Sequence, residues 1–572
     1  MNTGKMKFRW QTLLWLLPLG FLAVFYFYPL GSILAVSLER AENGIGAVIL
    51  EVWGSPSIRK AVGFTFWQAG LSTLLTLMIG LPGAYLFGRY EFQGKQLLRA
   101  LTSVPFVMPT LVVAAAFDSL LGGRGWLNLG LMQLFNLDSA PIQVGQTLTA
   151  ILLAHIFYNT TIVIRLVGDF WTNLDPRLTQ AARMLGAKPW QAWLRVTLPL
   201  LAPALLAAAL LVFIFDFTSF GVILILGGPK FATIEVEIFY QAISLFNLPA
   251  AAVLASIQLI TTLALTTIYT RLVGKLSRPL TRRSEQVTLQ RLSTWRQRAM
   301  AGWLSTLMLV LFVTPLVSLG LRSVVQLEPE RRQRTLEEGP ALTGAFYRSL
   351  WEDSEDSMFT ATPGEALLTS MGYAGSTVVI SLLLGFPAAW MLAWQKEDLL
   401  SRVLDPLLML PIGTSAVTLG LGFIVALNRP PLDLRTSPAL IPLAHSLVAL
   451  PFVVRSLTPA LRTIQPQLRQ AAAMLGANPG QVIRFIDLPL VGRALLGSAV
   501  FAFTISLGEF GATALVGRPD RPTVPMMIYR YLGQPGALNY GRALALSTIL
   551  MLATAAGMLL IERVRVGEGA EF

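Results

Sequence analysis

Long apolar stretches recur along this chain and are separated by short polar connections. A run of about 20 apolar residues is long enough to cross the hydrocarbon core of a bilayer as a helix. Such runs lie near 12–36, 61–87, 100–122, 144–167, 200–225, 249–270, 300–322, 366–394, 402–426, 437–460, 490–515 and 538–561. The pattern predicts an all-α polytopic membrane protein with about twelve transmembrane helices.

The first apolar run could be mistaken for a secretion signal, because Lys5, Lys7 and Arg9 precede it. The run at 12–36 is longer than the apolar region of a signal peptide, and no cleavage site of the A-x-A type follows it. We therefore expect a retained first span.

The distribution of charge predicts the orientation of the chain. Basic residues collect in cytoplasmic loops, and segment 271–298 carries eight Lys or Arg against the single acid Glu285. Segment 327–365 carries nine acids against four arginines and should lie outside. With an even number of spans and a basic start, both termini are expected in the cytoplasm.

Composition supports the membrane assignment. The chain has 572 residues, of which 54% are hydrophobic and 13% charged, and it carries a formal net charge of +13. In a polytopic protein such an excess marks cytoplasmic loops, so we expect the lipid bilayer, and no nucleic acid, as the partner of this surface. The absence of cysteine excludes disulfides and thiolate metal sites.

An internal repeat divides the chain into two halves. A shift of 290 residues places Pro176–Gln191 on Pro466–Gln481 with most residues identical, and it places His155 on His445. Each half then has six spans in the same orientation, so the repeat is parallel. We expect a first repeat at 1–270, a basic cytoplasmic linker at 271–299 and a second repeat at 300–572 with an acidic external loop near 327–365.

The repeated segment lies between the fourth and fifth spans of each half and is too polar to cross the membrane. Pro176 and Pro466 suit the first turn of a helix, and Gly186 and Gly476 suit its C-terminal cap. Small residues on an exposed helix allow a partner to approach closely. The segment is predicted to be a docking surface without chemistry of its own.

The repeated segment resembles the EAA loop of ABC importer permeases. The matching residues are Gln180, Ala181, Ala182, Gly186, Pro199, Gln470, Ala471, Ala472, Gly476 and Pro489. The resemblance implies the type I importer permease fold, in which each loop forms a coupling helix that fits a cleft on an ATPase subunit. Gln stands here where the family usually has Glu, so an ion pair made by that carboxylate must be absent or replaced by a weaker neutral hydrogen bond.

The resemblance extends over nearly the whole chain and is strongest to the fused iron(III)/thiamine branch of these permeases. The segments that carry it are Gly123–Leu127, Leu226–Pro229, Thr233–Ala242 and Ser506–Gly511. It implies a bacterial inner-membrane subunit that receives a small cation, ferric iron or thiamine, from an external binding protein. It also implies two copies of a separate ATPase that use ATP, with no cofactor bound by this chain.

Ionisable residues within membrane spans are candidates for a substrate pathway. Asp216 and Glu509 occupy nearly corresponding places in the two halves, about one turn apart, and could face a shared pathway for a cation. The alternative is that each carboxylate pairs with a basic residue such as Arg165 or Arg455 and serves packing only.

Other polar and aromatic residues within the spans favour structural roles. His155 and His445 are expected to be hydrogen-bonded structural histidines. An aromatic stretch is expected to pack in the core or against lipid; it consists of Phe213, Phe215, Phe217 and Phe220.

Motifs for bond-making chemistry are missing from the sequence. It has no G-x-x-x-x-G-K-[ST] phosphate loop, no H-E-x-x-H and no G-x-S-x-G. We predict no catalytic residue and no metal site. Two other classes remain as alternatives: an ion-coupled secondary transporter, which would lack paired coupling loops, and a membrane enzyme, which would need a catalytic cluster at one depth.

Overall fold

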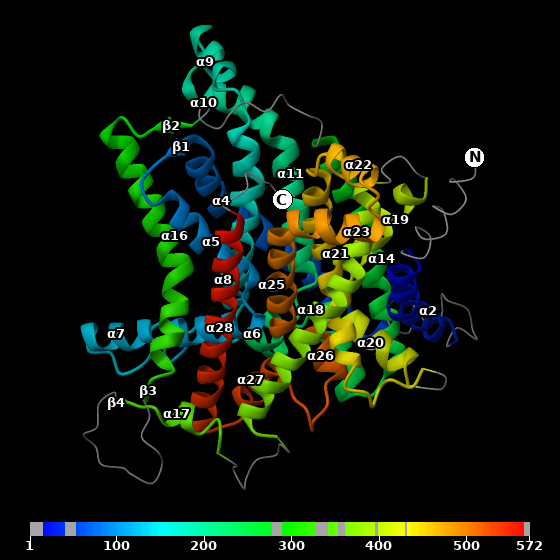
Figure 1. The fold of residues 1–572 in the computed structure, drawn as a ribbon. Coiled ribbons are helices and arrows are strands. Elements are labelled where there is room, and N and C mark those ends of the chain that lie inside the picture. Colours follow the sequence, from blue (N-terminus) through cyan, green and yellow to red (C-terminus); the bar gives the residue numbers. More distant parts are fainter. Residues whose placement is uncertain are drawn as a thin grey trace.

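The computed structural model describes residues 15–39, 53–276, 289–326, 341–352, 361–394, 399–428 and 432–565. Within these ranges the chain is almost wholly helical (Figure 1). Two short strand pairs complete it: β1 (Tyr90–Glu91) pairs in parallel with β2 (Gln290–Arg291), and β3 (Val325–Gln326) pairs antiparallel with β4 (Ala341–Leu342). The all-α prediction is confirmed.

The first half contains helices that alternate between long membrane-crossing segments and short connecting ones. They are η1 (Ala23–Phe27), α2 (Tyr28–Glu39), α4 (Pro56–Arg89), α5 (Lys95–Val107), α6 (Thr110–Leu121), α7 (Trp126–Phe135), α8 (Leu148–Thr172), α9 (Pro176–Met184), α10 (Pro189–Ala192), η3 (Trp193–Thr197), α11 (Leu198–Phe217), α12 (Gly221–Leu226), η4 (Gly228–Lys230), α13 (Ile234–Phe239), η5 (Tyr240–Ser244) and α14 (Leu248–Leu276).

The second half repeats this order. Its helices are α16 (Trp295–Arg322), α17 (Ala345–Arg348), α18 (Pro363–Trp394), α19 (Leu399–Met409), η6 (Leu410–Gly413), α20 (Ala416–Ala426), α21 (Leu440–Arg462), α22 (Pro466–Met474), α23 (Pro479–Val482), η7 (Ile483–Asp487), α24 (Leu488–Leu490), α25 (Gly492–Gly508), α26 (Gly511–Val516), α27 (Val524–Leu532) and α28 (Ala537–Arg565).

Nine helices in the described ranges are long and apolar enough to cross a bilayer, and twelve spans result if three sharply bent helix pairs are each counted once. The bends measure 110° between α5 and α6, 100° between η6 and α20, and 74° between α24 and α25. The expected spans at 100–122 and 402–426 are therefore broken rather than straight. The expected spans at 200–225 and 490–515 also end early, because α11 stops at Phe217 and α25 at Gly508.

Local chemistry accounts for two of these breaks. Pro109 stands between α5 and α6, and a proline disfavours helical backbone at the residue before it. Ser415 starts α20 as an N-cap, with its hydroxyl accepting from the backbone N–H of Val417 and Thr418. A hydropathy pattern records apolar length and cannot register such breaks.

The two halves are interlocked in space. Helices α4, α8 and α11 pack together in the first half, as α18, α21 and α25 do in the second. The first helix of each half crosses over: α2 packs on α20, and α16 packs on α5 and α6. One apolar core cluster joins residues of both halves, including Phe157 and Phe312 in mutual contact. Burial of that shared core holds the halves together.

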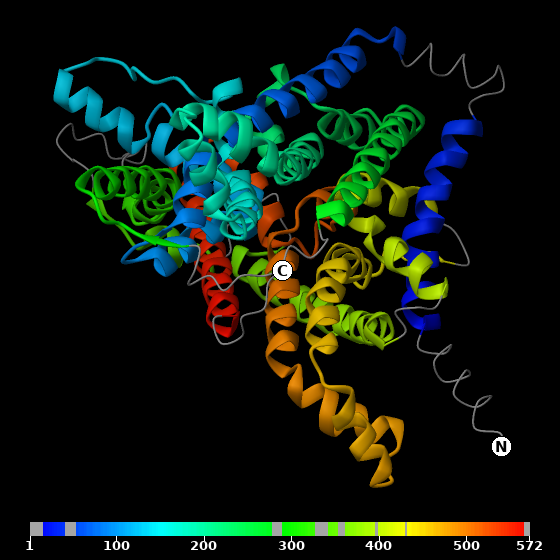
Figure 2. The same cartoon turned by 90° about the horizontal axis from the view of Figure 1, so that it is seen from above.

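The short repeated helices lie at one end of the molecule and the β3–β4 pair with α17 at the other (Figure 1). From above, loop 466–487 extends outward beyond the membrane helices (Figure 2).

Helix α14 continues to Leu276, so the expected linker 271–299 begins within a helix, and its residues 277–288 lie outside the described ranges. The basic start and residues 327–340 and 353–360 of the expected acidic loop also lie outside them.

Candidate coupling loops and substrate cavity

The two repeated segments adopt the same local structure. Helix α9 begins at Pro176 and α22 at Pro466, as predicted, and neither helix has a buried residue. Gly186 and Gly476 follow with φ angles of +90° and +83°, which only glycine adopts readily. These glycines end the first helix and let the chain turn into the second.

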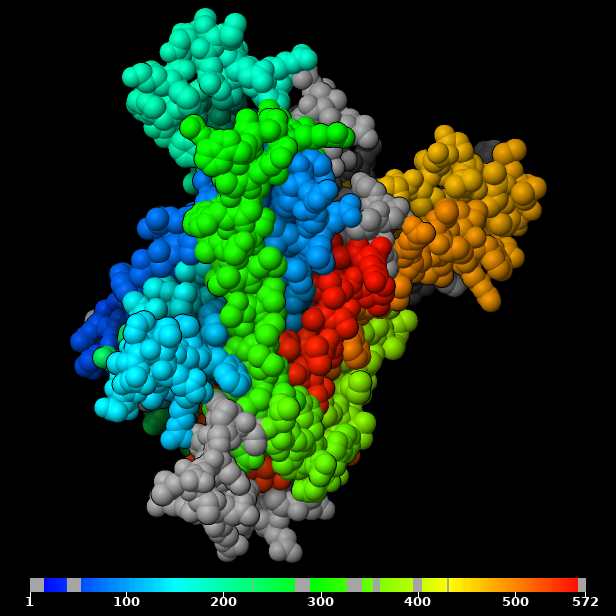
Figure 3. All heavy atoms as spheres, turned by 90° about the vertical axis from the view of Figure 1, so that its left-hand side faces the viewer, coloured from blue at the N-terminus to red at the C-terminus, as the bar shows by residue number. Residues whose placement is uncertain are grey.

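The predicted coupling residues are accessible. Gln180, Ala181 and Gly186 are exposed, and so are their matched residues in the second half. Ala182 and Ala472 are half-buried, while Pro199 and Pro489 stand exposed where the chain returns to the next span. Figure 3 shows both loops projecting from the body of the molecule.

The sequence analysis missed the most exposed apolar side chains of these loops. Met184 and Leu185 are each 89% exposed, and Met474 and Leu475 are 89% and 90% exposed. Such exposed apolar pairs at the tip of a projecting loop are candidates for a protein contact. They stand in the repeated sequence, and their position before a C-capping glycine was the signal that could have identified them.

A cavity of about 360 Å³ lies between the halves. Two of the three bends line it, through Pro109 between α5 and α6 and Ser415 before α20. The segments that follow α11 and α25 also contribute to its wall. Its acidic lining residues are Asp216, Glu235 and Glu509, and no Lys or Arg is among the described residues that line it. The aromatic lining consists of Phe106, Tyr158, Phe215, Phe220, Phe452, Phe501 and Phe510.

Phe220 and Phe510 close the contact between the halves. Their rings stack with centroids 5.5 Å apart and an interplanar angle of 18°. Gly221 leaves the space that this contact needs, since an added Cβ would lie 2.4 Å from Thr110 Oγ1 and 3.3 Å from the Phe510 ring. Of the predicted aromatic stretch, Phe217 is buried in the core, whereas Phe215 and Phe220 line the cavity.

Each candidate pathway carboxylate lies beside the repeat-matched histidine of its own half. His155 Nδ1 is 3.4 Å from Asp216 Oδ1, and its Nε2 is hydrogen-bonded to Ser219 at 2.8 Å. Asn159 Nδ2 donates to the same oxygen of Asp216 at 2.7 Å. Asp216 is thus held in a fixed orientation at the cavity wall.

The second half uses the same positions with the acid and the serine exchanged. His445 Nδ1 is 2.8 Å from Ser506 Oγ, and its Nε2 is 3.2 Å from Glu509 Oε2. The 290-residue shift places Asp216 on Ser506 and Ser219 on Glu509. This exchange explains why the two acids stand one turn apart, and both histidines are hydrogen-bonded, as predicted.

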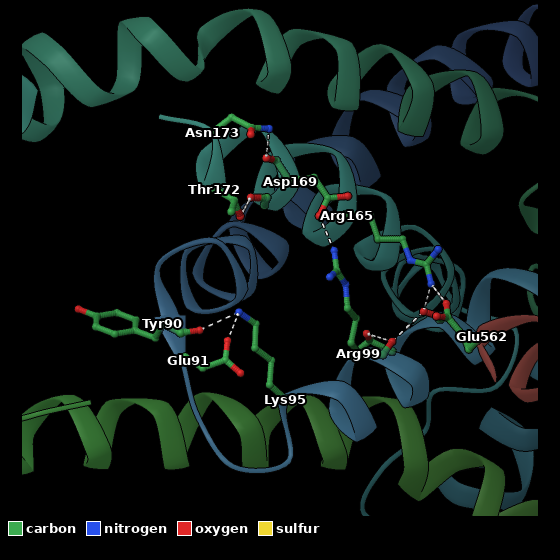
Figure 4. A network of polar contacts seen from close by, with 12 residues as sticks. Tyr90, Glu91, Lys95, Arg99, Arg165, Asp169, Thr172, Asn173 and Glu562 are labelled. Carbon is green, nitrogen blue, oxygen red and sulfur yellow. Dashed lines mark hydrogen bonds and ion pairs between the residues drawn. The ribbon is translucent and has the colours of Figure 1, made fainter. Parts of the chain in front are cut away.

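The arginines proposed as alternative partners of these acids lie elsewhere. Arg165 pairs with Glu562 of α28 and with Ser103 (Figure 4). Arg455 Nε donates to Met409 Sδ at 3.2 Å. The alternative that Arg165 or Arg455 neutralises Asp216 and Glu509 is wrong, because the matched histidines occupy the space beside both carboxylates.

Glu235 was not singled out by the sequence analysis as a pathway residue. It lies in α13, is fully buried and accepts from Gln258 Nε2. The sequence places it outside the expected spans, within the segment Thr233–Ala242 that carries the family resemblance, so its burial gave no signal in the sequence. No group of three His, Cys, Asp or Glu able to hold a metal ion is present in the described ranges.

Two interlocked helical repeats, a largely apolar cavity with three carboxylates between them and a pair of projecting repeated loops are the features of a membrane-embedded transport permease. The chain belongs to the family described as binding-protein-dependent transport system inner membrane component, whose match covers residues 77–282 and 381–565, one match in each half. It is therefore a transport subunit rather than an enzyme. Permeases of this family work with an ATPase and a substrate-binding protein, so the secondary-transporter and membrane-enzyme alternatives are set aside.

Several curated relatives match most of the chain. The thiamine transport system permease protein ThiP of Escherichia coli K12 is 29% identical over 508 residues, covering 85% of this chain and 87% of that protein. The proteins of the same name from Salmonella typhimurium LT2 and Haemophilus influenzae are 28% and 26% identical, each covering over nine-tenths of both chains. A solved bacterial alginate ABC transporter aligns with a TM-score of 0.40 and 17% identity, covering 48% of this chain and 97% of that chain.

Proposed function

We propose that this chain is the permease of a thiamine importer in a bacterial inner membrane. The observation that carries the substrate is the agreement of three relatives, each named a thiamine permease and each covering at least 85% of this chain. Thiamine joins an aromatic pyrimidine to a cationic thiazolium ring. A cavity with three carboxylates and several aromatic rings suits such a molecule through charge attraction and cation–π contact.

Within this proposal, Asp216 and Glu509 line the translocation pathway, and Glu235 joins them. Their carboxylates reach the cavity from α11, from the segment before α26 and from α13. Carboxylates from both halves would let the substrate stay bound while the halves move apart. In this proposal, alternating access separates and re-forms the stacked contact between Phe220 of the first half and Phe510 of the second.

The proposed orientation has the coupling loops and both termini in the cytoplasm. The C-terminal end of α28 lies toward the same end of the molecule as α9 and α22 (Figure 1). The described basic residues of 289–298 follow β2 at that end. This arrangement agrees with the excess of basic residues expected on the cytoplasmic side.

We further propose that two copies of an ABC ATPase dock on the two loops and bind all the ATP. Gln180 and Gln470 offer a neutral hydrogen bond to the ATPase where a carboxylate would offer an ion pair. The apolar pairs Met184–Leu185 and Met474–Leu475 would provide the larger buried area of each contact.

Changing Leu185 and Leu475 to Asp tests the docking surface. Two charges buried against the partner should prevent ATPase co-purification while the permease still inserts. The matched control is Leu342→Asp, since Leu342 is 85% exposed at the opposite end of the molecule and should tolerate the charge. Retained co-purification of the Leu185 and Leu475 variant would contradict the docking assignment.

The substrate is tested by reconstituting the purified complex in liposomes with its binding protein. ATP-dependent uptake of labelled thiamine, saturable and absent without the binding protein, is the expected result. Uptake of ferric iron in place of thiamine would overturn the substrate while leaving the permease class intact. Uptake driven by an ion gradient without ATP would overturn the ATPase proposal.

A further inference from the structure

The second coupling helix is tied to its half by a cluster of charged and aromatic side chains. Arg469 of α22 forms an ion pair with Asp487, with 3.1 Å between Nη2 and Oδ2. Its guanidinium carbon lies 4.1 Å from the centre of the Trp394 ring and 5.1 Å from that of Trp390. Trp390 Nε1 donates to the same Asp487 oxygen at 2.9 Å. We call Arg469, Asp487, Trp390 and Trp394 the second-half latch.

The latch joins three elements. Arg469 belongs to the coupling helix, Asp487 ends the π-helical segment η7, and both tryptophans stand in the last turns of α18. Asp487 is fully buried, whereas the Arg469 side chain is 20% exposed. Burial lowers the pKa of the Arg469 guanidinium and the Asp487 carboxylate opposes that shift, so the arginine stays charged. Charge-assisted bonds of this kind are roughly twice as strong as neutral ones.

The first half has no such latch at the matched positions. The 290-residue shift places Thr179 on Arg469 and Thr197 on Asp487, and the two threonine hydroxyls lie 3.2 Å apart. The offset that matches Gly80 with Gly385 places Arg89 on Trp394. At the positions of Arg469 and Asp487 the first half therefore has one neutral hydrogen bond, while Arg89 interacts electrostatically with Asp175 at the start of α9.

The connection from the coupling loop to the next span is straighter in the first half than in the second. In the first half, Pro189–Phe217 forms one continuous helix that leads from the coupling loop to Asp216 at the cavity. In the second half, the matching helix is bent by 74° between Leu490 and Gly492. Gly492 stands at the position of Ala202, and glycine is the weaker helix former.

We propose that the two halves transmit the motion of the docked ATPases by different routes. The first half uses the continuous helix from Pro189 to the cavity. The second half uses the latch, which bypasses the bend at Val491 and couples α22 directly to α18. Arg469 and Asp487 are positioning residues for this step, and the proposal rests on the docking role of the loops given above.

The test compares matched pairs in the two halves. The double variant Arg469→Thr with Asp487→Thr gives the second half the first half's pair and leaves no buried carboxylate unpaired. The control, Thr179→Val with Thr197→Val, removes the corresponding bond of the first half. Each is made in the full chain and measured in complex with the ATPase for thiamine taken up per ATP hydrolysed.

We expect the second-half variant to keep its ATP hydrolysis and to lose on the order of tenfold in uptake per ATP. The control should stay within about twofold, because the continuous helix carries its route. Arg469→Lys keeps the ion pair without the planar stacking and should give an intermediate ratio. Equal losses in both double variants, or none in either, would overturn the proposal.

A second measurement needs no ATPase. Hydrogen exchange of backbone amides in the chain alone should be slower in 467–475 than in 177–185, and the second-half variant should remove the difference. Equal exchange in the unaltered chain would overturn the latch. If the ATPase fails to dock at all, the proposed function fails, while this exchange ratio still decides whether the latch exists.

Discussion

Single residues show that the two halves share positions more closely than they share residue types. Each half surrounds its histidine with one acid and one serine, but the acid precedes the serine in the first half and follows it in the second. Each histidine nitrogen therefore has a polar neighbour in both halves. The carboxylates reach the cavity from non-equivalent sites, which gives an approximately symmetric fold an asymmetric charge pattern.

Neutralising Asp216 tests its pathway role. Asp216→Asn keeps the shape of the side chain and removes the charge, and we expect the KM for thiamine uptake to rise on the order of tenfold. The measurement is the uptake rate against the concentration of loaded binding protein. A fall in protein yield with an unchanged KM would instead support a packing role.

Moving the acid provides a matched control for that prediction. Asp216→Ser with Ser219→Glu copies the arrangement of the second half and restores one carboxylate beside His155. We expect this variant to transport better than Asp216→Ser alone, because the cation again meets a charge at this wall. Equal rates for the two variants would argue against an electrostatic role for this position.

At the scale of elements, short helices and breaks in the spans determine where the projecting loops and the cavity lie. The coupling helices owe their ends to Gly186 and Gly476, and the cavity lies where two spans break at Pro109 and Ser415. A left-handed glycine costs roughly 1–2 kcal/mol to replace with an L-residue. Elements of this kind are thus sensitive to single substitutions that a straight span would tolerate.

Replacing both coupling glycines with Val should abolish uptake and leave membrane insertion intact. The φ angles of +90° and +83° strain any β-branched residue, so the loop must shift away from its docked shape. The two measurements are thiamine uptake and the protection of the inserted chain from protease added outside the membrane.

Gly94→Val is the strain-matched control, because Gly94 has a φ of +83° and no neighbour within 4 Å of an added Cβ. It lies between β1 and α5, outside both coupling loops, and should retain uptake. Loss of uptake in this control as well would point to general strain rather than docking.

At the scale of the molecule, the halves are joined by exchange of their first helices. Helix α2 packs on α20, and α16 on α5 and α6, so neither half buries its own surface alone. The ion pair between Arg165 and Glu562 adds a polar tie at the end that bears the coupling loops (Figure 4). The covalent linker is one of several connections between the halves.

Cutting the chain within 277–288 should leave a functional permease. Two fragments expressed together are expected to co-purify and to transport, since the exchanged helices and the shared core hold them. Expression of either fragment alone should give aggregated or degraded protein, because an apolar face then lacks its cover. A stable single fragment would contradict the interlocked arrangement as the source of stability.

The sequence anticipated much of the candidate site. It predicted both coupling helices with their proline starts and glycine ends, and it singled out Asp216, Glu509 and the two histidines. Its alternative, that Arg165 or Arg455 pairs with the acids, was wrong, because a basic residue in the preceding span is a reasonable neighbour until the packing of α8 against α11 is known. It included Glu235 and Met184 only as members of longer motifs. A motif does not show that Glu235 is buried or that Met184 is exposed.

The sequence by itself determined the membrane as solvent, the two repeats and the duplicated segment between the fourth and fifth spans of each half, because hydrophobic length and internal identity can be read directly from the chain. Only the tertiary structure decided which acids meet in one cavity, which first helix covers which half and how Arg469 is held. Those features depend on contacts between residues hundreds of positions apart, such as Arg165 with Glu562 and Phe220 with Phe510. The apolar pattern of a helix predicts that the helix is buried, but only the packing of the folded chain shows which helices or lipids cover it.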